Sequence, residues 1–139
     1  RYVTDFPNAV IAGHDKVVTL PHLGASTEES EDNCAIMAVK QTMDFIENGN
    51  IKNSVNYPAC DAGICTAASR LTVCHKNIPN MLTRFTGAFS DKGINVSDMV
   101  SKSRGDWAYT ILDTAEKADA DMVKTIEAID GVVKVRVVK

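Results

Sequence analysis

The stretch RLTVCHKNIPNMLTRFTGAF, residues 70–89, decides the fold class of this sequence. Leu71 and Val73 alternate with polar residues at its start, which is typical of a strand. Pro79 predicts the first turn of a helix. An apolar stripe at helical spacing follows: Leu82, Phe85 and Phe89. Gly93 predicts the end of this helix, so the stretch indicates a strand followed by an amphipathic helix.

The residues after this helix complete a larger pattern. NVSDMVSKSRGDWAYTILD, residues 95–113, predicts two strands joined by a turn at Gly105. A second helical stripe ends before Gly131 and consists of Met122, Ile126 and Ile129. VVKVRVV, residues 132–138, alternates and predicts a strand with three valines facing inward: Val133, Val135 and Val137. The order strand-helix-strand-strand-helix-strand over 70–139 predicts an α+β ferredoxin-like domain.

Residues 1–50 predict an α/β piece made of a strand, a turn and a long helix. KVVTL, residues 16–20, is typical of a buried strand. Ser26 and Glu29 form a capping box, and an apolar stripe follows: Ile36, Val39, Met43 and Ile46. Because this piece is too short to bury a core alone, we expect it to pack against further chain or another subunit. The start at Arg1, inside a strand-like segment, leads us to expect a fragment of a longer protein.

Composition narrows the function classes. The 139 residues carry a net charge of -3 and are 45% hydrophobic, which suits one or two small globular domains. Without a Lys/Arg run, neither nucleic acid nor an anionic membrane is an expected partner. No apolar stretch approaches the roughly 20 residues that span a bilayer, and we expect a cytoplasmic protein. The four cysteines lack the spacing of a zinc site, so reduced thiols and no metal are expected.

A histidine lies in the PHLG turn, residues 21–24, directly after the strand at 16–20. Ligands of α/β proteins bind at the carboxyl ends of strands, which makes His22 a candidate proton donor or acceptor for carbonyl chemistry. Gly24 allows close approach of a ligand and is a candidate cofactor contact. A structural role for His22 is the alternative.

Four motifs carry a resemblance to a known family: PHLGAST, NSVNYP, RLTVCHKNIPNML and DKGINV. Together they resemble the C-terminal part of the D-3-phosphoglycerate dehydrogenases, a branch of the D-2-hydroxyacid dehydrogenases. The resemblance covers the whole chain. It implies three parts: the end of the catalytic region (1–52), a linker (53–69) and an ACT regulatory domain (70–139).

The family resemblance implies an enzyme that oxidises 3-phosphoglycerate to 3-phosphohydroxypyruvate with NAD in L-serine biosynthesis. His22 matches the family's acid/base. The family pairs this histidine with an upstream glutamate, whereas Asp5 and Asn8 stand in that region here, so the carboxylate partner stays unassigned. The glycines show no G-x-G-x-x-G spacing, the main NAD motif, and the chain alone is expected to be inactive.

In the ACT domain the resemblance implies an allosteric site for L-serine. His75, Asn77 and Asn95 match the family's serine-contacting positions, and Asn80 stands where the family usually has glycine. The family further implies a homodimer formed through ACT domains, with a tetramer of the longer protein as a further option. A stand-alone amino-acid-binding or oligomerisation module without dehydrogenase chemistry is the alternative function. A metal chaperone of the same fold needs a C-x-x-C motif, which CHKNIP lacks.

Overall fold

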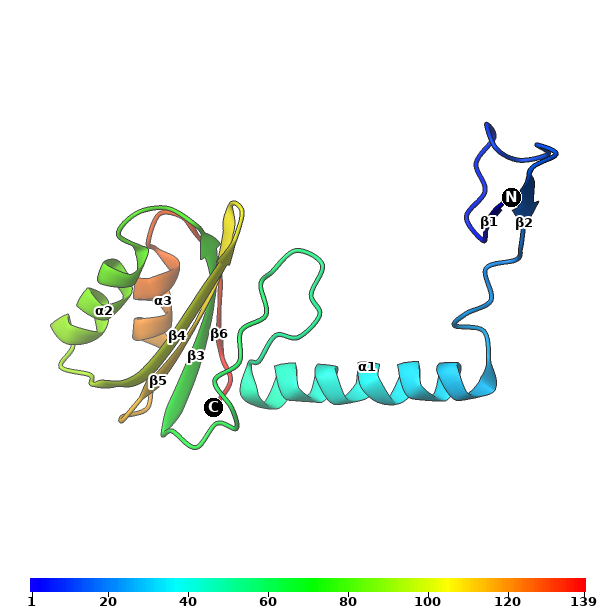
Figure 1. Cartoon of the computed structure of the whole chain (residues 1–139). Helices are drawn as coiled ribbons and strands as arrows, with labels where there is room; N and C mark the ends of the chain where they lie inside the picture. Colours follow the sequence, from blue (N-terminus) through cyan, green and yellow to red (C-terminus); the bar gives the residue numbers. More distant parts are fainter. The chain divides into compact units, whose positions relative to one another are not determined.

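The computed structural model describes residues 1–139. They fall into two units, Arg1–Val39 and Lys40–Lys139, and each is described by itself. The long helix α1 (Glu28–Asn48) begins in the first unit and ends in the second. Figure 1 shows the order of the elements along the chain.

Two short parallel strands form the first unit together with the start of α1. β1 (Tyr2–Thr4) pairs with β2 (Val17–Thr19), so that Val3 lies opposite Val18. The predicted strand at 16–20 is present in a shorter form, but the prediction that it is buried is wrong, since Val18 and Leu20 are exposed. Because the two strands are parallel, their carboxyl ends lie at the same edge.

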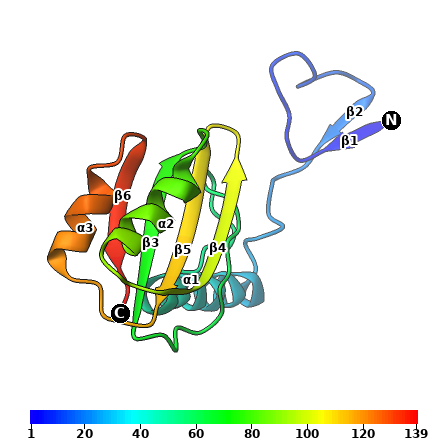
Figure 2. The same cartoon turned by 90° about the vertical axis from the view of Figure 1, so that its left-hand side faces the viewer.

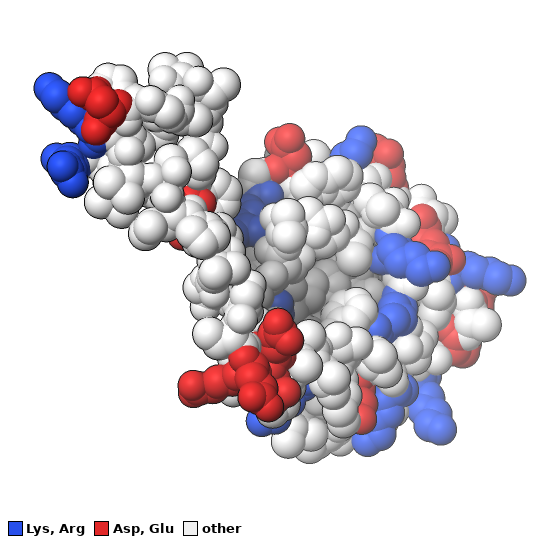
Figure 3. Space-filling model, turned by 90° about the vertical axis from the view of Figure 1, so that its right-hand side faces the viewer, with Lys and Arg blue, Asp and Glu red and all other residues white.

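Thr27, not Ser26, caps the start of α1. The Thr27 Oγ1 atom accepts a hydrogen bond from the Ser30 backbone N–H at 3.2 Å, whereas the Ser26 N–H donates to the Leu23 carbonyl at 2.9 Å. The predicted capping box at Ser26 and Glu29 is therefore wrong, because Ser26 belongs to the preceding turn. Acidic side chains gather in the first helical turn (Figure 3), where they complement the positive end of the helix dipole: Glu28, Glu29 and Glu31.

The apolar stripe of α1 is exposed in this chain. Its four predicted members, Ile36, Val39, Met43 and Ile46, have between 49% and 59% of their surface accessible. Burial of the stripe against further chain or another copy stays a prediction. The helix stops as predicted at Gly49, whose φ of 75° suits a residue without a Cβ atom.

Gly49→Ala should destabilise the second unit by about 2–4 kcal/mol. An alanine is strained in the left-handed backbone conformation of Gly49, and its Cβ atom would also clash with a neighbouring side chain. A Cβ atom at Gly49 would lie 2.5 Å from the Cγ2 atom of Thr72. Gly63 is a matched control, since its φ of 68° is similar and a Cβ atom there meets nothing within 4 Å. Urea unfolding should show a clearly smaller loss for Gly63→Ala; equal losses would mean that the contact with Thr72 does not matter.

A four-stranded antiparallel sheet forms the second unit, in the order β4-β5-β3-β6. Its strands are β3 (Ser69–Lys76), β4 (Val96–Arg104), β5 (Trp107–Thr114) and β6 (Val132–Val137). Its two helices, α2 (Met81–Asp91) and α3 (Ala120–Glu127), cover one face of the sheet, as Figure 2 shows. The predicted ferredoxin-like order of strands and helices is confirmed.

The main core lies between the two helices and the sheet. Its buried side chains are Leu71, Val73, Met81, Phe85, Phe89, Leu112, Met122, Ile126 and Val135. Pro79 lies before α2 rather than in its first turn, because Asn80 takes a left-handed conformation with φ of 68° just before the helix. The helix therefore buries Met81 and leaves Leu82 exposed, which corrects the predicted stripe at that position.

A bulge changes the predicted inward face of β6. Residue pairing shifts between Cys74 and His75, so Val132 lies opposite His75 and Val133 has no partner in β3. Val133 is exposed as a result, whereas Val132 packs against the core and Val135 is buried. The prediction that Val133 faces inward is therefore wrong, whereas Val137 lies opposite the core residue Leu71 but is partly exposed near the end of the strand.

Residues before β3 cover the other face of the sheet. Ile51 and Cys60 form an isolated bridge and pack with Tyr109 and Ile111 in a second core cluster. The segment 53–69, predicted as a linker, lies within the second unit. The predicted three-part division of the chain stays a prediction, because it concerns the parts of a longer protein.

Three side chains of the sheet hold the end of α1. Arg70 Nη1 donates to the Asn48 carbonyl at 2.9 Å, and the Tyr109 hydroxyl donates to the Gly49 carbonyl at 2.8 Å. Arg136 Nη2 donates to two carbonyls one turn earlier, those of Phe45 and Ile46. The last turn of a helix lacks internal partners for its carbonyls, so these donors complete it. The end of α1 is thereby fixed to the sheet.

Candidate functional site

The first candidate site is the His22 turn. His22 follows β2 and Asp5 follows β1, so the parallel pairing brings both residues to one edge. The His22 Nδ1 atom lies 2.8 Å from the Asp5 Oδ2 atom, and Phe6 packs edge-on against the imidazole at 4.5 Å between ring centroids. This hydrogen bond from His22 holds the pKa of Asp5 below its usual value. In this chain Asp5 is thus the carboxylate beside His22, where the sequence left the partner unassigned.

This geometry sets which imidazole nitrogen is available. A carboxylate accepts the hydrogen bond, so His22 Nδ1 carries a proton and Nε2 has no partner within the chain. A carboxylate on Nδ1 orients the ring and stabilises the imidazolium that forms when Nε2 takes a proton. The turn can therefore serve as an oriented acid/base.

The other residues of this region have local roles. Asn8 Oδ1 accepts from the backbone N–H groups of Val10 and Ile11 at 3.0 and 3.2 Å, which closes a turn. No heavy atom lies within 4 Å of a Cβ atom built on Gly24, so nothing in this chain crowds that position. A cofactor contact at Gly24 stays a prediction.

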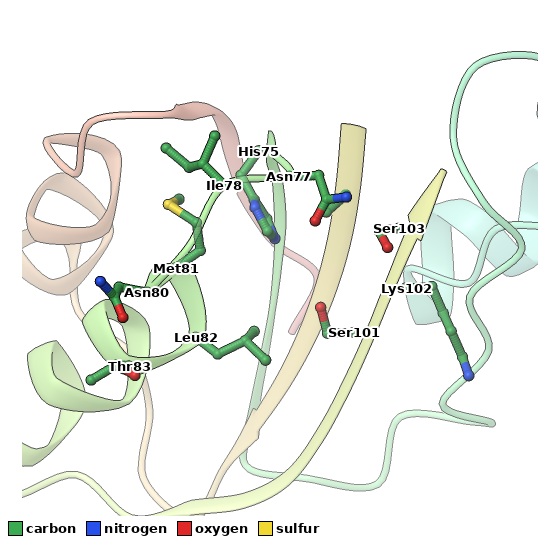
Figure 4. A pocket seen from close by; sticks show the side chains of 11 residues that line it. His75, Asn77, Ile78, Asn80, Met81, Leu82, Thr83, Ser101, Lys102 and Ser103 are labelled. Atoms are coloured by element: carbon green, nitrogen blue, oxygen red, sulfur yellow. The ribbon is translucent and has the colours of Figure 1, made fainter. Parts of the chain in front are cut away.

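The second candidate site is a cleft of about 430 Å³ between the start of α2 and strands β4 and β5. Three of the four predicted allosteric residues line it: His75, Asn77 and Asn80 (Figure 4). Asn95 lies in a separate depression beside Gly93, at the other end of α2. A single chain therefore does not bring all four residues together.

His75 lies at the floor of this cleft with both ring nitrogens in use. Nδ1 lies 2.8 Å from the Lys76 carbonyl oxygen, and Nε2 lies 2.9 Å from the Thr110 hydroxyl. The ring is 3% exposed and packs edge-on against Phe85. Burial lowers the pKa of His75, and the hydrogen bond with Lys76 partly offsets this effect.

Asn77 and Asn80 lie at the rim. Asn77 Nδ2 donates to the Gly105 carbonyl at 3.0 Å, which leaves its side-chain oxygen without a partner in the chain. Asn80 precedes α2 and makes no side-chain capping bond, so the first N–H groups of this helix have no side-chain partner. Its left-handed backbone explains why glycine suits this position. The rim thus offers donors for an anionic group and an amide acceptor.

Two polar residues of the cleft were not predicted from the sequence. Ser101 lines the cleft and Thr110 lies beneath it, with 2.8 Å between their hydroxyl oxygens. They lie opposite each other on neighbouring strands. The sequence could have indicated both residues, because polar residues at inward positions of a strand are uncommon and need hydrogen-bond partners.

The structure contains neither a metal-binding cluster nor a helix that could cross a membrane. No group of three or more His, Cys, Asp or Glu side chains lies close enough to hold a metal ion. All four cysteines are free thiols, and burial raises the pKa of Cys60 to about 11. None of the helices has the length and apolar character needed to cross a bilayer.

Comparison with known proteins shows which sequences are similar to this chain. No family model matches the chain. D-3-phosphoglycerate dehydrogenase of Escherichia coli (strain K12) is 26% identical over 126 residues, covering 88% of this chain and 30% of that protein. The corresponding protein of Dictyostelium discoideum is 28% identical over 86% of this chain and 29% of its own length. A putative D-3-phosphoglycerate dehydrogenase of Schizosaccharomyces pombe is 32% identical over 72% of this chain and 22% of its own length.

The chain thus spans about 30% of the length of the curated relatives it matches first. Among solved structures, the ACT domain from GTP pyrophosphokinase of Chlorobium tepidum superposes with a TM-score of 0.43 at 16% identity, over 50% of this chain and 94% of that one. The sequence matches extend through both units. Over 88% of its residues, the chain is homologous to the C-terminal part of D-3-phosphoglycerate dehydrogenases.

Proposed function

We propose that this chain acts as the C-terminal part of an NAD-dependent D-3-phosphoglycerate dehydrogenase and carries its amino-acid-sensing ACT domain. The enzyme would oxidise 3-phosphoglycerate to 3-phosphohydroxypyruvate in the cytoplasmic synthesis of L-serine. The observation that carries this proposal is the His22–Asp5 pair in a chain homologous to these dehydrogenases.

The role of His22 in this reaction is proton transfer. In the oxidative direction, the free Nε2 atom accepts the proton of the substrate hydroxyl while the carbinol hydride leaves. Asp5 stabilises the resulting imidazolium through Nδ1. NAD accepts the hydride when it is bound, and its usual glycine motif is absent from this sequence. The chain therefore contributes acid/base chemistry but no nucleotide-binding loop.

The role of the cleft is to bind a small amino acid, with L-serine as the proposed effector. The uncapped N–H groups at the start of α2 suit a carboxylate, because the positive end of the helix dipole adds to their attraction. The amide of Asn77 offers both donors and an acceptor to a zwitterion with a hydroxyl group. Asn80 borders the same space, and His75 forms part of the floor.

A homodimer would complete this site. β4 is an edge strand of the sheet, and its unpaired backbone groups favour pairing with a second copy. A two-fold axis makes the two β4 strands antiparallel, so the start of one strand lies beside the end of the other. Asn95, just before the start of β4, would then approach the partner's cleft near Ser103, at the end of its β4.

The alternative function is a stand-alone amino-acid-binding or oligomerisation module. The core of the second unit favours it, since all members of that core lie within the unit. The two functions differ in whether a substitution of His22 changes the rate of a reaction.

Asn95→Ala should weaken L-serine binding by about ten-fold to a hundred-fold, because one hydrogen bond to a charged ligand is lost. The side chain of Asn95 makes no hydrogen bond within the chain, so its removal leaves the monomer intact. Calorimetric titration of the 139-residue chain measures this loss, with Asn33→Ala, an exposed position of α1 in the first unit, as the control. Equal affinity of the wild type and Asn95→Ala would refute the shared site, and no heat with the wild type would refute serine sensing.

A further inference from the structure

The floor of the cleft contains a chain of three hydrogen bonds. It runs from the Lys76 carbonyl oxygen to His75 Nδ1 at 2.8 Å and from His75 Nε2 to the Thr110 hydroxyl at 2.9 Å. The last bond joins the Thr110 hydroxyl to the Ser101 hydroxyl at 2.8 Å. Thr110 is fully buried, whereas Ser101 lines the cleft. The chain therefore connects the protein interior to the surface that a ligand meets.

The direction of these hydrogen bonds is fixed at their inner end. A carbonyl oxygen only accepts, so His75 Nδ1 must carry a proton. A neutral imidazole then has a lone pair at Nε2, which accepts the single proton of the Thr110 hydroxyl. Thr110 in turn must accept from Ser101. Burial lowers the pKa of His75, which favours this neutral ring.

Two consequences follow for a ligand in the cleft. Both nitrogens of His75 are used inside the chain, so the ring has no donor left for a bound molecule. Ser101 has donated its only proton to Thr110 and presents lone pairs to the cleft. Figure 4 shows Lys102 pointing to the other side of β4, so its charge does not compete at this position. The floor of the cleft at Ser101 is thus a hydrogen-bond acceptor.

We propose that Ser101 receives the ammonium group of the bound amino acid, and that Thr110 and His75 hold Ser101 in this accepting state without touching the ligand. The ammonium group has three N–H donors and no acceptor, which matches an oxygen that only accepts. The ligand's carboxylate then lies toward the uncapped start of α2. The inference rests on the proposed function of the cleft and adds a binding residue and two positioning residues to it.

Ser101→Ala should weaken L-serine binding to the 139-residue chain about ten-fold to a hundred-fold, because a charged hydrogen bond is lost. Thr125→Ala is the control, since it removes a hydroxyl from α3, where Thr125 bonds only the Asp121 carbonyl and lies outside the cleft. Thr110→Val keeps the side-chain shape and should weaken binding several-fold, because Ser101 can then turn its proton toward the ligand. Thr110→Ser restores the hydroxyl and should restore the affinity, which a purely structural role of Thr110 does not require.

The outcomes separate this inference from the proposed function. If L-serine binds but Ser101→Ala and Thr110→Val bind it as tightly as the wild type, the inference is wrong and serine sensing stands. If the wild type binds none of the common L-amino acids, both are wrong. Nitrogen-15 NMR of His75 tests the hydrogen-bond chain without any ligand. A proton on Nδ1 and none on Nε2 is expected, and the opposite tautomer would overturn the inference.

Discussion

Arg70→Ala should lower the free energy of unfolding of the second unit by about 3–5 kcal/mol, the usual result of breaking a buried ion pair. Arg70 is 1% exposed and forms a bidentate salt bridge with Asp113. Its Nε atom lies 2.6 Å from Asp113 Oδ1, and its Nη2 atom lies 2.7 Å from Asp113 Oδ2. Its guanidinium also donates hydrogen bonds to the carbonyls of Asn48, Ala62 and Gly63. The substitution leaves a buried carboxylate and the carbonyls of Asn48 and Ala62 without their donor, whereas the Gly63 carbonyl keeps its hydrogen bond from Asn50 Nδ2 at 3.2 Å.

A double-mutant cycle tests this explanation. Asp113→Ala alone should also be strongly destabilising, because it leaves the guanidinium unpaired. The double substitution should cost clearly less than the sum of the two single losses, since neither charge is then left alone. Urea unfolding followed by Trp107 fluorescence gives the three values. Strictly additive losses would show that the pair itself does not stabilise the unit.

His22→Asn should lower the turnover of a full-length dehydrogenase that contains this chain by a factor of about 10²–10⁴, the usual contribution of a general acid/base. This prediction rests on the proposed function. Asp5→Asn should lower turnover less, because the ring keeps its free Nε2 atom but loses the carboxylate that orients it. Steady-state rates of NAD reduction with 3-phosphoglycerate measure both effects.

The chain offers a matched control for His22. His14 is also exposed and also lies beside an aspartate, with 3.0 Å between its Nδ1 atom and the Asp15 Oδ1 atom. It lies in the connection between β1 and β2 rather than at their carboxyl ends. His14→Asn should therefore leave turnover unchanged. Near-normal turnover in His22→Asn would contradict the acid/base role and favour the stand-alone module.

Periodicity in the sequence was sufficient to predict the order of elements in the second unit, because each apolar stripe faces one core. Periodicity failed where one local feature of the backbone decides which side chains are buried. Val133 is exposed because of one bulge in β6, and Met81 replaces Leu82 in the core because Asn80 adopts a left-handed conformation. Thr27 replaces Ser26 as the helix cap for a similar local reason. Alternation of residue types does not reveal these events.

The candidate sites were harder to predict than the order of elements, because they consist of residues that lie far apart in the sequence. The Asp5–His22 pair requires the parallel pairing of two strands, which the sequence of either strand alone does not specify. Ser101 lies beside Thr110 because of the register of β4 against β5, and Thr110 lies beside His75 because of the register of β5 against β3. His75 and Asn77 were predicted only through the resemblance to a known family, because polar residues at the end of one strand do not by themselves indicate a binding site.

The attachment of the end of α1 to the sheet has a consequence for cooperativity. Arg70, Tyr109 and Arg136 hold carbonyls of the last helical turns, and each belongs to a different strand. Fraying of these turns must therefore break bonds to three strands at once, so they belong to the same cooperative unit as the sheet. Any ligand that stabilises the sheet then also suppresses the opening of the helix end.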